Sequence, residues 1–132
     1  MIREKSCGAV IFYRDDKILY LVEQMIQGHY ALCKGHVEGN ETEMQTAARE
    51  IREETGLEVT FIPGFREKTE YSPYSGCIKE VVYFLAESKG KANRVQPEEV
   101  SALLWLDYNQ AMRFLTYESD KKILANARKF IK

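Results

Sequence analysis

Residues 35–57 read GHVEGNETEMQTAAREIREETGL, a glycine-containing segment that leads into a strongly acidic one. Within it, residues 42–55 are predicted to form a helix, because apolar residues recur there at helical spacing: Met44, Ala47, Ala48 and Ile51. Two capping-box patterns compete for the start of this helix: Thr42 with Gln45, and Asn40 with Glu43. Gly56 stands where a left-handed C-terminal cap is expected.

Three glutamates share one face of this predicted helix. Glu50, Glu53 and Glu54 stand at positions i, i+3 and i+4, and like charges at these spacings repel one another. Solvent and Arg49, four residues before Glu53, offset part of that repulsion. A divalent cation would offset more, since Mg²⁺ prefers oxygen ligands and is often held by carboxylates together with substrate phosphates. The same residues would also suit a solvated helix face, which is the alternative interpretation.

The whole segment matches every fixed position of the Nudix box, GX5EX7REUXEEXGU, in which U is a bulky aliphatic residue. The chain therefore resembles the Nudix hydrolases, which hydrolyse a nucleoside diphosphate linked to another moiety with Mg²⁺ or Mn²⁺. The resemblance implies that Glu53 and Glu54 chiefly bind metal and that Glu50 binds metal or acts as a base. Gly35 is expected to offer its backbone carbonyl to the metal, and Arg49 to orient Glu53. A metal-activated water would then attack a phosphoanhydride.

Stretches outside the box resemble the asymmetrical bis(5′-nucleosyl)-tetraphosphatases, which cleave diadenosine tetraphosphate to ATP and AMP. Residues 34–38 read KGHVE, a segment of that group, and they imply that Lys34 and His36 contact substrate. Lys79 precedes a strand-like VVYFLAE run and matches a lysine that contacts phosphate. The resemblance thus assigns a cluster of basic side chains to the polyphosphate.

A tyrosine and an acidic residue extend this resemblance. Tyr71 matches an adenine-stacking tyrosine by its neighbours, whereas a count from the box favours Tyr74. Glu99 matches an acidic residue beyond the box that serves in metal binding or as a base. The chain departs from the group at Cys33, where the group usually has a proline.

The rest of the chain predicts helices packed on a mixed sheet, an α/β (α+β) fold. Strands are expected at residues 6–13, 18–25, 57–62, 65–71 and 78–87, with a short buried segment at 103–106. Helices are expected at 109–115 and 119–131, the second with Ile123, Ala127, Phe130 and Ile131 facing inward, and loops at 28–39 and 88–99. The resemblance implies a Nudix α/β/α sandwich with a partly curved sheet and a loop–helix–loop catalytic motif, in one domain over residues 1–132.

Composition limits the class of protein and of partner. The chain has 132 residues, of which 45% are hydrophobic and 30% charged, and its net charge of -1 argues against long nucleic acid as a partner. No window approaches ~18 consecutive apolar residues, so no membrane span is expected. The three cysteines form no CxxC pair and fit a reducing cytoplasm. A monomer or homodimer in the cytoplasm is expected.

The expected substrate is a small nucleotide, with a dinucleoside polyphosphate such as diadenosine tetraphosphate favoured. Another Nudix activity is the alternative: nucleoside triphosphate sanitising, nucleotide-sugar pyrophosphatase or RNA 5′-pyrophosphohydrolase. A catalytically inactive nucleotide-binding module is a further alternative, although all three helix carboxylates are present.

Overall fold

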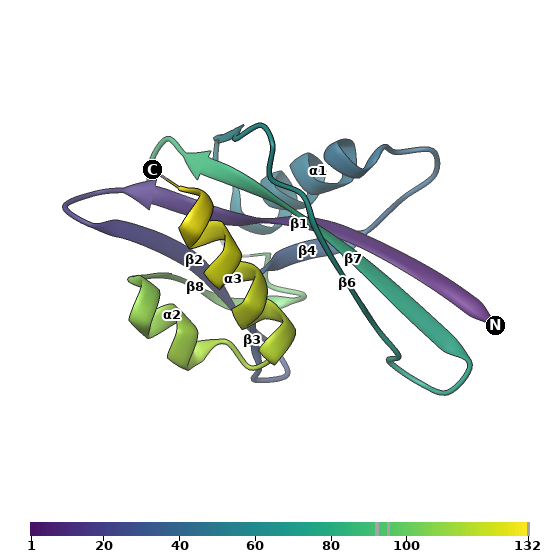
Figure 1. Cartoon of the computed structure of the whole chain (residues 1–132). Coiled ribbons are helices and arrows are strands. Elements are labelled where there is room, and N and C mark those ends of the chain that lie inside the picture. The colour runs from purple at the N-terminus through teal and green to yellow at the C-terminus, as the bar shows by residue number, and fades with distance from the viewer. Residues whose placement is uncertain (92, 95, 132) are drawn as a thin grey trace.

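A computed structural model describes residues 1–91, 93–94 and 96–131 of the chain (Figure 1). The strands are β1 (Ile2–Arg14), β2 (Ile18–Met25), β3 (Tyr30–Ala31), β4 (Cys33–His36), β5 (Val59–Phe61), β6 (Glu67–Tyr71), β7 (Cys77–Ser88) and β8 (Val100–Leu106). The helices are α1 (Glu43–Thr55), α2 (Tyr108–Phe114) and α3 (Glu118–Phe130).

The sheet is built around two long strands, β1 and β7, which pair in parallel from Ile2 opposite Cys77 to Phe12 opposite Glu87. Strand β1 also pairs antiparallel with β4 in its middle, at residues 6–9, and with β2 at its end, at residues 12–14. Strands β5 and β6 pair antiparallel with β7, while β3 and β8 pair antiparallel with β2. The predicted mixed sheet is confirmed, and it is open rather than closed into a barrel.

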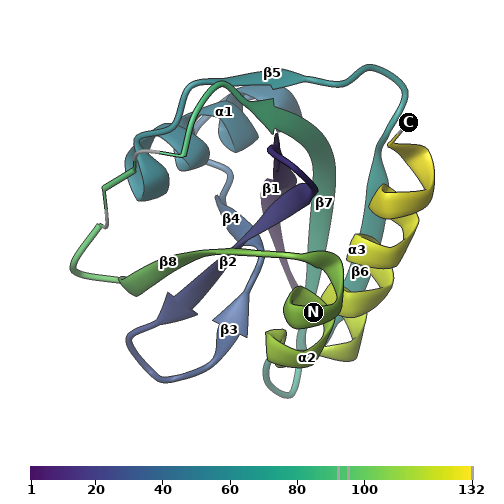
Figure 2. The same ribbon diagram turned by 90° about the vertical axis from the view of Figure 1, so that its left-hand side faces the viewer.

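Helices cover both faces of this sheet, with α1 on one face and α2 and α3 on the other (Figure 2). Because side chains alternate along a strand, β1 contributes to two separate cores. Val10 and Phe12 lie in the core under α2 and α3, whereas Ala9 and Ile11 lie in the core that includes Ile51 of α1. The predicted α/β/α arrangement is therefore confirmed.

The ends of α1 are fixed by local hydrogen bonds. The Thr42 side chain accepts a hydrogen bond from the backbone N–H of Gln45 at 3.1 Å, and the Gln45 side chain accepts one from the backbone N–H of Thr42 at 2.9 Å. This capping box settles the start of the helix in favour of Thr42 over Asn40. Gly56 ends the helix with φ 69°, and its N–H donates to the carbonyl of Arg52.

Two expectations from the sequence are wrong. Residues 28–39, expected as a loop, contain β3 and β4. Strand β4 packs closely on β1 at Gly8, where an added Cβ would overlap the backbone of Cys33. Glycine is therefore needed for this pairing, although glycine is uncommon within strands. Met44, expected on the apolar face of its helix, is 40% exposed because it lies in the first turn of α1. Phe130, in the last turn of α3, is 39% exposed, but its ring faces inward onto the buried Phe65, with 5.5 Å between the centroids.

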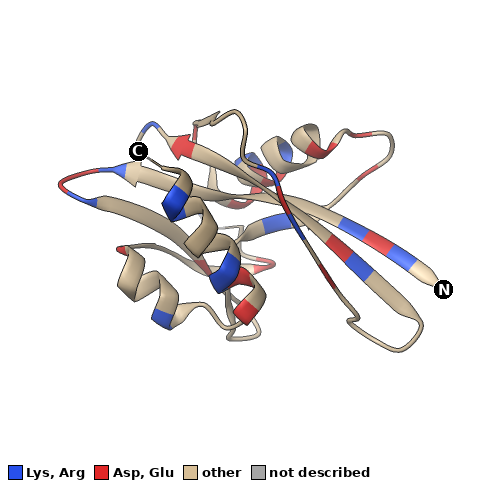
Figure 3. Cartoon of the chain, viewed as in Figure 1, with Lys and Arg blue, Asp and Glu red and all other residues tan. Residues whose placement is uncertain are grey.

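Charged residues of both signs alternate along parts of the strands (Figure 3). Lys5 of β1, for example, forms ion pairs with Glu43 of α1 at 2.6 Å and with Glu80 of β7 at 3.4 Å. Among the described residues, no helix is both long and apolar enough to cross a membrane.

Candidate active site

Arg49 lies at the centre of the acidic face of α1. Its Nη1 atom donates hydrogen bonds to Oε1 of Glu50 at 2.9 Å and to Oε1 of Glu53 at 2.7 Å. Its Nε and Nη2 atoms donate to the two carboxylate oxygens of Glu41 at 2.7 and 3.1 Å. Nη2 also donates to the carbonyl oxygen of His36 at 2.9 Å. One guanidinium therefore offsets the repulsion among three carboxylates and ties α1 to β4.

Gly35 of β4 lies directly against the carboxylate of Glu50. A Cβ built on Gly35 would overlap the carboxyl carbon and both oxygens of Glu50, so only glycine leaves room for that side chain. Glu50 itself is nearly buried. The arrangement brings a backbone segment and a carboxylate together, and oxygen donors of these two kinds are those that Mg²⁺ and Ca²⁺ take.

Glu54 points inward from α1, unlike the exposed Glu53. Its Oε1 atom accepts a hydrogen bond from the thiol of Cys33 at 3.4 Å. Glu23 of β2 is buried beside both residues. Burial raises the pKa of Glu54, and the adjacent carboxyl groups of Glu23 and Glu50 raise it further. Burial is also the main cause that raises the pKa of Glu23. Two acidic side chains thus meet inside the protein where α1 packs on the sheet.

Sequence reasoning missed Glu23. It ends the apolar run of residues 18–23, and strand alternation places it on the same face as Leu21, which packs in the core with Ile51 of α1. An acidic residue at an inward-facing strand position was the available signal. Its partners could not be deduced, because Cys33 and Glu54 come from other elements.

A cavity of about 470 Å³ lies where the start of α3 meets β4, β6 and β7. Its lining comprises His29, Lys34, Thr69, Tyr71, Lys79, Val81, Tyr83, Tyr117, Glu118, Ser119 and Asp120. Two lysines and three tyrosines thus face one hollow, a combination suited to an anionic ligand that carries an aromatic ring. Burial lowers the pKa of Lys79, and the positive charge of Lys34 adds to the effect.

The cavity and the carboxylates meet at β4. Lys34 lines the cavity, and the next residue, Gly35, lies against Glu50. Successive residues of a strand face opposite sides and are only ~3.3 Å apart along it. The two groups therefore lie on opposite sides of β4. Within the described residues β4 pairs only with β1, so a ligand with several phosphates would contact both groups by passing around the unpaired edge of β4.

The predicted substrate residues are only partly brought together. Lys34, Tyr71 and Lys79 line the cavity. Tyr74 lies in the turn between β6 and β7, outside that lining, and is 51% exposed. The geometry therefore favours Tyr71 over Tyr74 as the ring that faces a ligand.

His36 and Glu99 lie apart from the cavity lining. His36 is exposed, and its described contact with the acidic face is the backbone carbonyl that Arg49 binds. Glu99 is exposed in the turn before β8, where its carbonyl accepts a hydrogen bond from the N–H of Ile26 at 3.0 Å. After burial, the charge of Glu99 is among the causes that raise the pKa of Glu23.

Asp120 of α3 was not predicted as a site residue. It is buried at the cavity, and its two carboxylate oxygens accept hydrogen bonds from the hydroxyl of Tyr83 at 3.3 Å and from the N–H of Leu32 at 3.4 Å. Acidic residues are common in the first turn of a helix, because they interact favourably with the positive end of the helix dipole. The sequence therefore held no signal that Asp120 lines a cavity.

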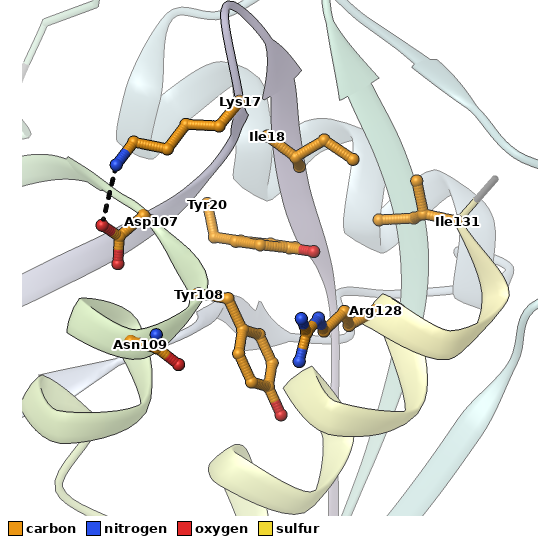
Figure 4. A pocket seen from close by; sticks show the side chains of 8 residues that line it. All are labelled: Lys17, Ile18, Tyr20, Asp107, Tyr108, Asn109, Arg128 and Ile131. Carbon is orange, nitrogen blue, oxygen red and sulfur yellow. Dashed lines mark hydrogen bonds and ion pairs between the residues drawn. The ribbon is translucent and has the colours of Figure 1, made fainter.

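A second cavity, of about 430 Å³, lies between the β1–β2 turn and helices α2 and α3 (Figure 4). Lys17 pairs with Asp107 at 3.3 Å at its edge, and the guanidinium of Arg128 lies 4.3 Å from the ring centroid of Tyr108. Among the described residues, its lining includes no glutamate of α1, so it is separate from the acidic face.

Comparison with known proteins agrees with this geometry. A family model, the NUDIX domain, matches residues 3–127. The chain is 33% identical over 140 residues to the asymmetrical bis(5′-nucleosyl)-tetraphosphatase of Sus scrofa, covering 96% of this chain and 95% of that protein. It is 39% identical over 103 residues to an 8-oxo-(d)GTP phosphatase of Mycolicibacterium smegmatis, covering 78% of this chain and 30% of that protein.

A crystal structure of a C. elegans Ap4A hydrolase binary complex superposes with a TM-score of 0.88 and 27% sequence identity, covering 96% of each chain. The fold, the spacing of the box and the family match lead to one conclusion. The chain belongs to the Nudix family of hydrolases.

Proposed function

We propose that this Nudix hydrolase cleaves dinucleoside polyphosphates, with diadenosine tetraphosphate giving ATP and AMP. The observation that carries the proposal is the position of β4, whose Lys34 faces the lysine- and tyrosine-lined cavity while Gly35 lies against Glu50. The similarity to the Sus scrofa tetraphosphatase over nearly the whole of both chains supports the same substrate.

The cavity would hold one nucleotide end of the substrate. Lys34 and Lys79 bind phosphate oxygens, and Tyr71 stacks on a base. Burial, followed by the positive charge of Lys34, lowers the pKa of Lys79, and an anionic phosphate would offset both effects. Binding of a phosphate would therefore stabilise the charged form of both lysines, and the charged lysines would in turn strengthen substrate binding.

The acidic face would hold Mg²⁺ or Mn²⁺ through Glu50, Glu53 and Glu54 and the carbonyl of Gly35. When bound, a divalent cation neutralises phosphate oxygens and lowers the pKa of a water molecule toward neutrality. Glu50 is the first candidate to accept the proton of the attacking water, and the exposed Glu99 is the second. Arg49 keeps Glu50 and Glu53 in position through its hydrogen bonds.

Product identification tests this proposal. The protein is incubated with diadenosine tetraphosphate and Mg²⁺, and the nucleotides are separated by ion-exchange chromatography. Equal amounts of ATP and AMP are expected as the first products. Two molecules of ADP as the first products would contradict asymmetrical cleavage.

Nucleoside triphosphate sanitising is a second candidate, favoured by the 39% identity to an 8-oxo-(d)GTP phosphatase. Initial rates are compared on diadenosine tetraphosphate, 8-oxo-dGTP, ADP-ribose and a 5′-triphosphorylated oligoribonucleotide. The last two substrates represent the nucleotide-sugar and RNA activities. A higher kcat/KM on any of the other three would replace the proposed substrate, and tight nucleotide binding without hydrolysis would indicate a binding module.

Replacing Tyr71 by alanine should raise KM for diadenosine tetraphosphate about tenfold, because stacking of a base on an aromatic ring is worth ~1–3 kcal/mol. Steady-state kinetics measure the change. Tyr74→Ala is the matched control, since Tyr74 is a similarly exposed tyrosine outside the cavity lining. A larger rise in KM for Tyr74→Ala than for Tyr71→Ala would reassign the stacking residue.

Arg49→Lys should lower kcat by roughly 10–100-fold, the usual effect of losing a residue that orients metal ligands. A lysine ammonium cannot bind Glu41, Glu50 and Glu53 together, because it lacks the planar fork of a guanidinium. Steady-state assays at saturating Mg²⁺ measure kcat. Arg52→Lys makes the same substitution at an exposed position of α1 and should leave kcat unchanged. Equal kcat values for Arg49→Lys and Arg52→Lys would show that Arg49 does not orient the carboxylates for the reaction.

A further inference from the structure

Three buried side chains from three separate elements converge between α1 and the sheet. Glu23 comes from β2, Cys33 from β4 and Glu54 from α1, and each residue is 1% exposed. Their potential metal-ligating atoms, two carboxylate oxygens and a sulfur, lie within 4.8 Å of one another. We call this group the buried triad. It is a product of the tertiary fold rather than a run of acidic residues on one helix.

Glu23 supplies the observation that points to a ligand. Its Oε2 atom is buried and has no hydrogen-bond partner within the part of the chain that the structure describes. Buried polar atoms are normally satisfied, and a buried carboxylate oxygen without a partner is costly. The thiol of Cys33 donates its hydrogen bond to Glu54, so it leaves the Oε2 atom of Glu23 unsatisfied. A cation bound by the Glu23 carboxylate would give this under-satisfied group a partner.

The donor set identifies the class of cation. Mg²⁺ and Ca²⁺ take oxygen ligands, whereas thiolate sulfur selects softer ions such as Zn²⁺. Zn²⁺ accepts cysteine sulfur and carboxylate oxygen together, and three protein ligands with a fourth position left open are common for it. The combination of the Cys33 thiol with the carboxylates of Glu23 and Glu54 therefore favours a transition metal of intermediate softness such as Zn²⁺.

We propose that Glu23, Cys33 and Glu54 form a binding site for a divalent transition metal of the Zn²⁺ class, additional to the Mg²⁺ or Mn²⁺ position at Glu50, Glu53 and Glu54. Binding forms one metal–sulfur and two metal–oxygen bonds, and the protons of the thiol and of any protonated carboxyl group leave to solvent. Glu54 is the residue that both positions share. The proposal concerns this site alone and does not depend on which nucleotide the enzyme cleaves.

Cobalt titration tests the triad directly, because Co²⁺ substitutes for Zn²⁺ and gives an intense near-ultraviolet band only when a thiolate is bound. The reduced, chelator-treated full chain is titrated with Co²⁺ and followed by absorbance. The parent protein should show the band, and added Zn²⁺ should abolish it. Cys33→Ser should lose the band, whereas Cys77→Ser, which alters another buried cysteine, should keep it. Glu23→Gln should keep the band at saturation but bind Co²⁺ at least tenfold more weakly.

Three results would overturn the proposal: no thiolate band in the parent, a band that survives in Cys33→Ser, or unchanged Co²⁺ affinity in Glu23→Gln. Circular dichroism confirms that each variant is folded. Should Cys33→Ser fail to fold, cadmium NMR of the parent decides, since sulfur ligation and all-oxygen ligation give distinct chemical shifts. These readouts need no hydrolysis, so failure of the metal site and failure of the proposed substrate are recorded separately.

Discussion

Glu54→Gln is expected to lower turnover by more than about 100-fold while making the chelator-treated protein more stable. Even residues that only orient metal ligands are worth about 10–100-fold, so loss of Glu54 as a proposed carboxylate ligand should cost more. Stability should rise because Glu54 is 1% exposed and lies next to Glu23, so its charge is costly in the folded state. Glutamine keeps the shape and carries no charge. Turnover on diadenosine tetraphosphate and melting by calorimetry in a chelating buffer measure the two effects.

The stability gain should depend on pH in a defined direction. In the unfolded chain Glu54 ionises near its ordinary pKa of 4.5, whereas burial, followed by the charge of Glu23, raises the pKa in the folded protein. Above pH 4.5 the unfolded state therefore binds fewer protons, and folding stability falls as pH rises toward the folded pKa. The loss is at most about 1.4 kcal/mol per pH unit. Parent and Glu54→Gln should melt alike near pH 4 and diverge toward pH 8.

Glu53→Gln is the matched control, because the side chain of Glu53 is 47% exposed on the same helix. It should lose turnover as a proposed metal ligand without the pH-dependent gain in stability. Unchanged turnover in Glu54→Gln would remove Glu54 from the metal site. A melting temperature of Glu54→Gln that follows the parent across the whole pH range would show that Glu54 is not buried as a costly charge.

Gly35→Ala should reduce kcat by about 100-fold, because the new methyl group would occupy the position of the Glu50 carboxylate. Either Glu50 or β4 must move, and a displacement of ~1 Å at a catalytic group can cost 10²-fold in rate. Steady-state kinetics over a range of Mg²⁺ concentrations measure the loss, which should persist at saturating metal if Glu50 no longer reaches its position.

Gly90→Ala provides the comparison for this variant. Among residues 1–91, 93–94 and 96–131, nothing lies within 4 Å of a Cβ added at Gly90, and the backbone there has no positive φ, so folding and kcat should match those of the parent. If Gly35→Ala were as active as Gly90→Ala, the close packing of Gly35 on Glu50 would have no part in the reaction.

Local signals account for what the sequence predicted well. The position of α1, its capping box at Thr42 and its left-handed end at Gly56 all follow from residues within one segment, and each is confirmed. Long apolar strands such as β7 were equally clear. Helices packed on a mixed sheet then followed from the order of the elements, whereas their placement on both faces was implied by the family resemblance.

Features that depend on contacts distant in sequence were missed. Strand β4 pairs with β1 where Gly8 allows a close approach, and the sequence of neither strand identifies the other as its partner. Glu23 and Asp120 became site residues only when the fold brought them to Glu54 and to the cavity. The choice between Tyr71 and Tyr74 likewise required the geometry of the β6–β7 turn.

We propose that Glu50, Glu53 and Glu54 hold divalent cations against a phosphoanhydride. A crystal structure of the protein with Mn²⁺ and a nonhydrolysable diadenosine tetraphosphate analogue is the decisive experiment, because anomalous scattering locates manganese without ambiguity. We expect manganese to be bound jointly by carboxylates of α1 and by phosphate oxygens, with one base against Tyr71. Manganese and polyphosphate bound elsewhere, with the α1 carboxylates contacting neither, would contradict it.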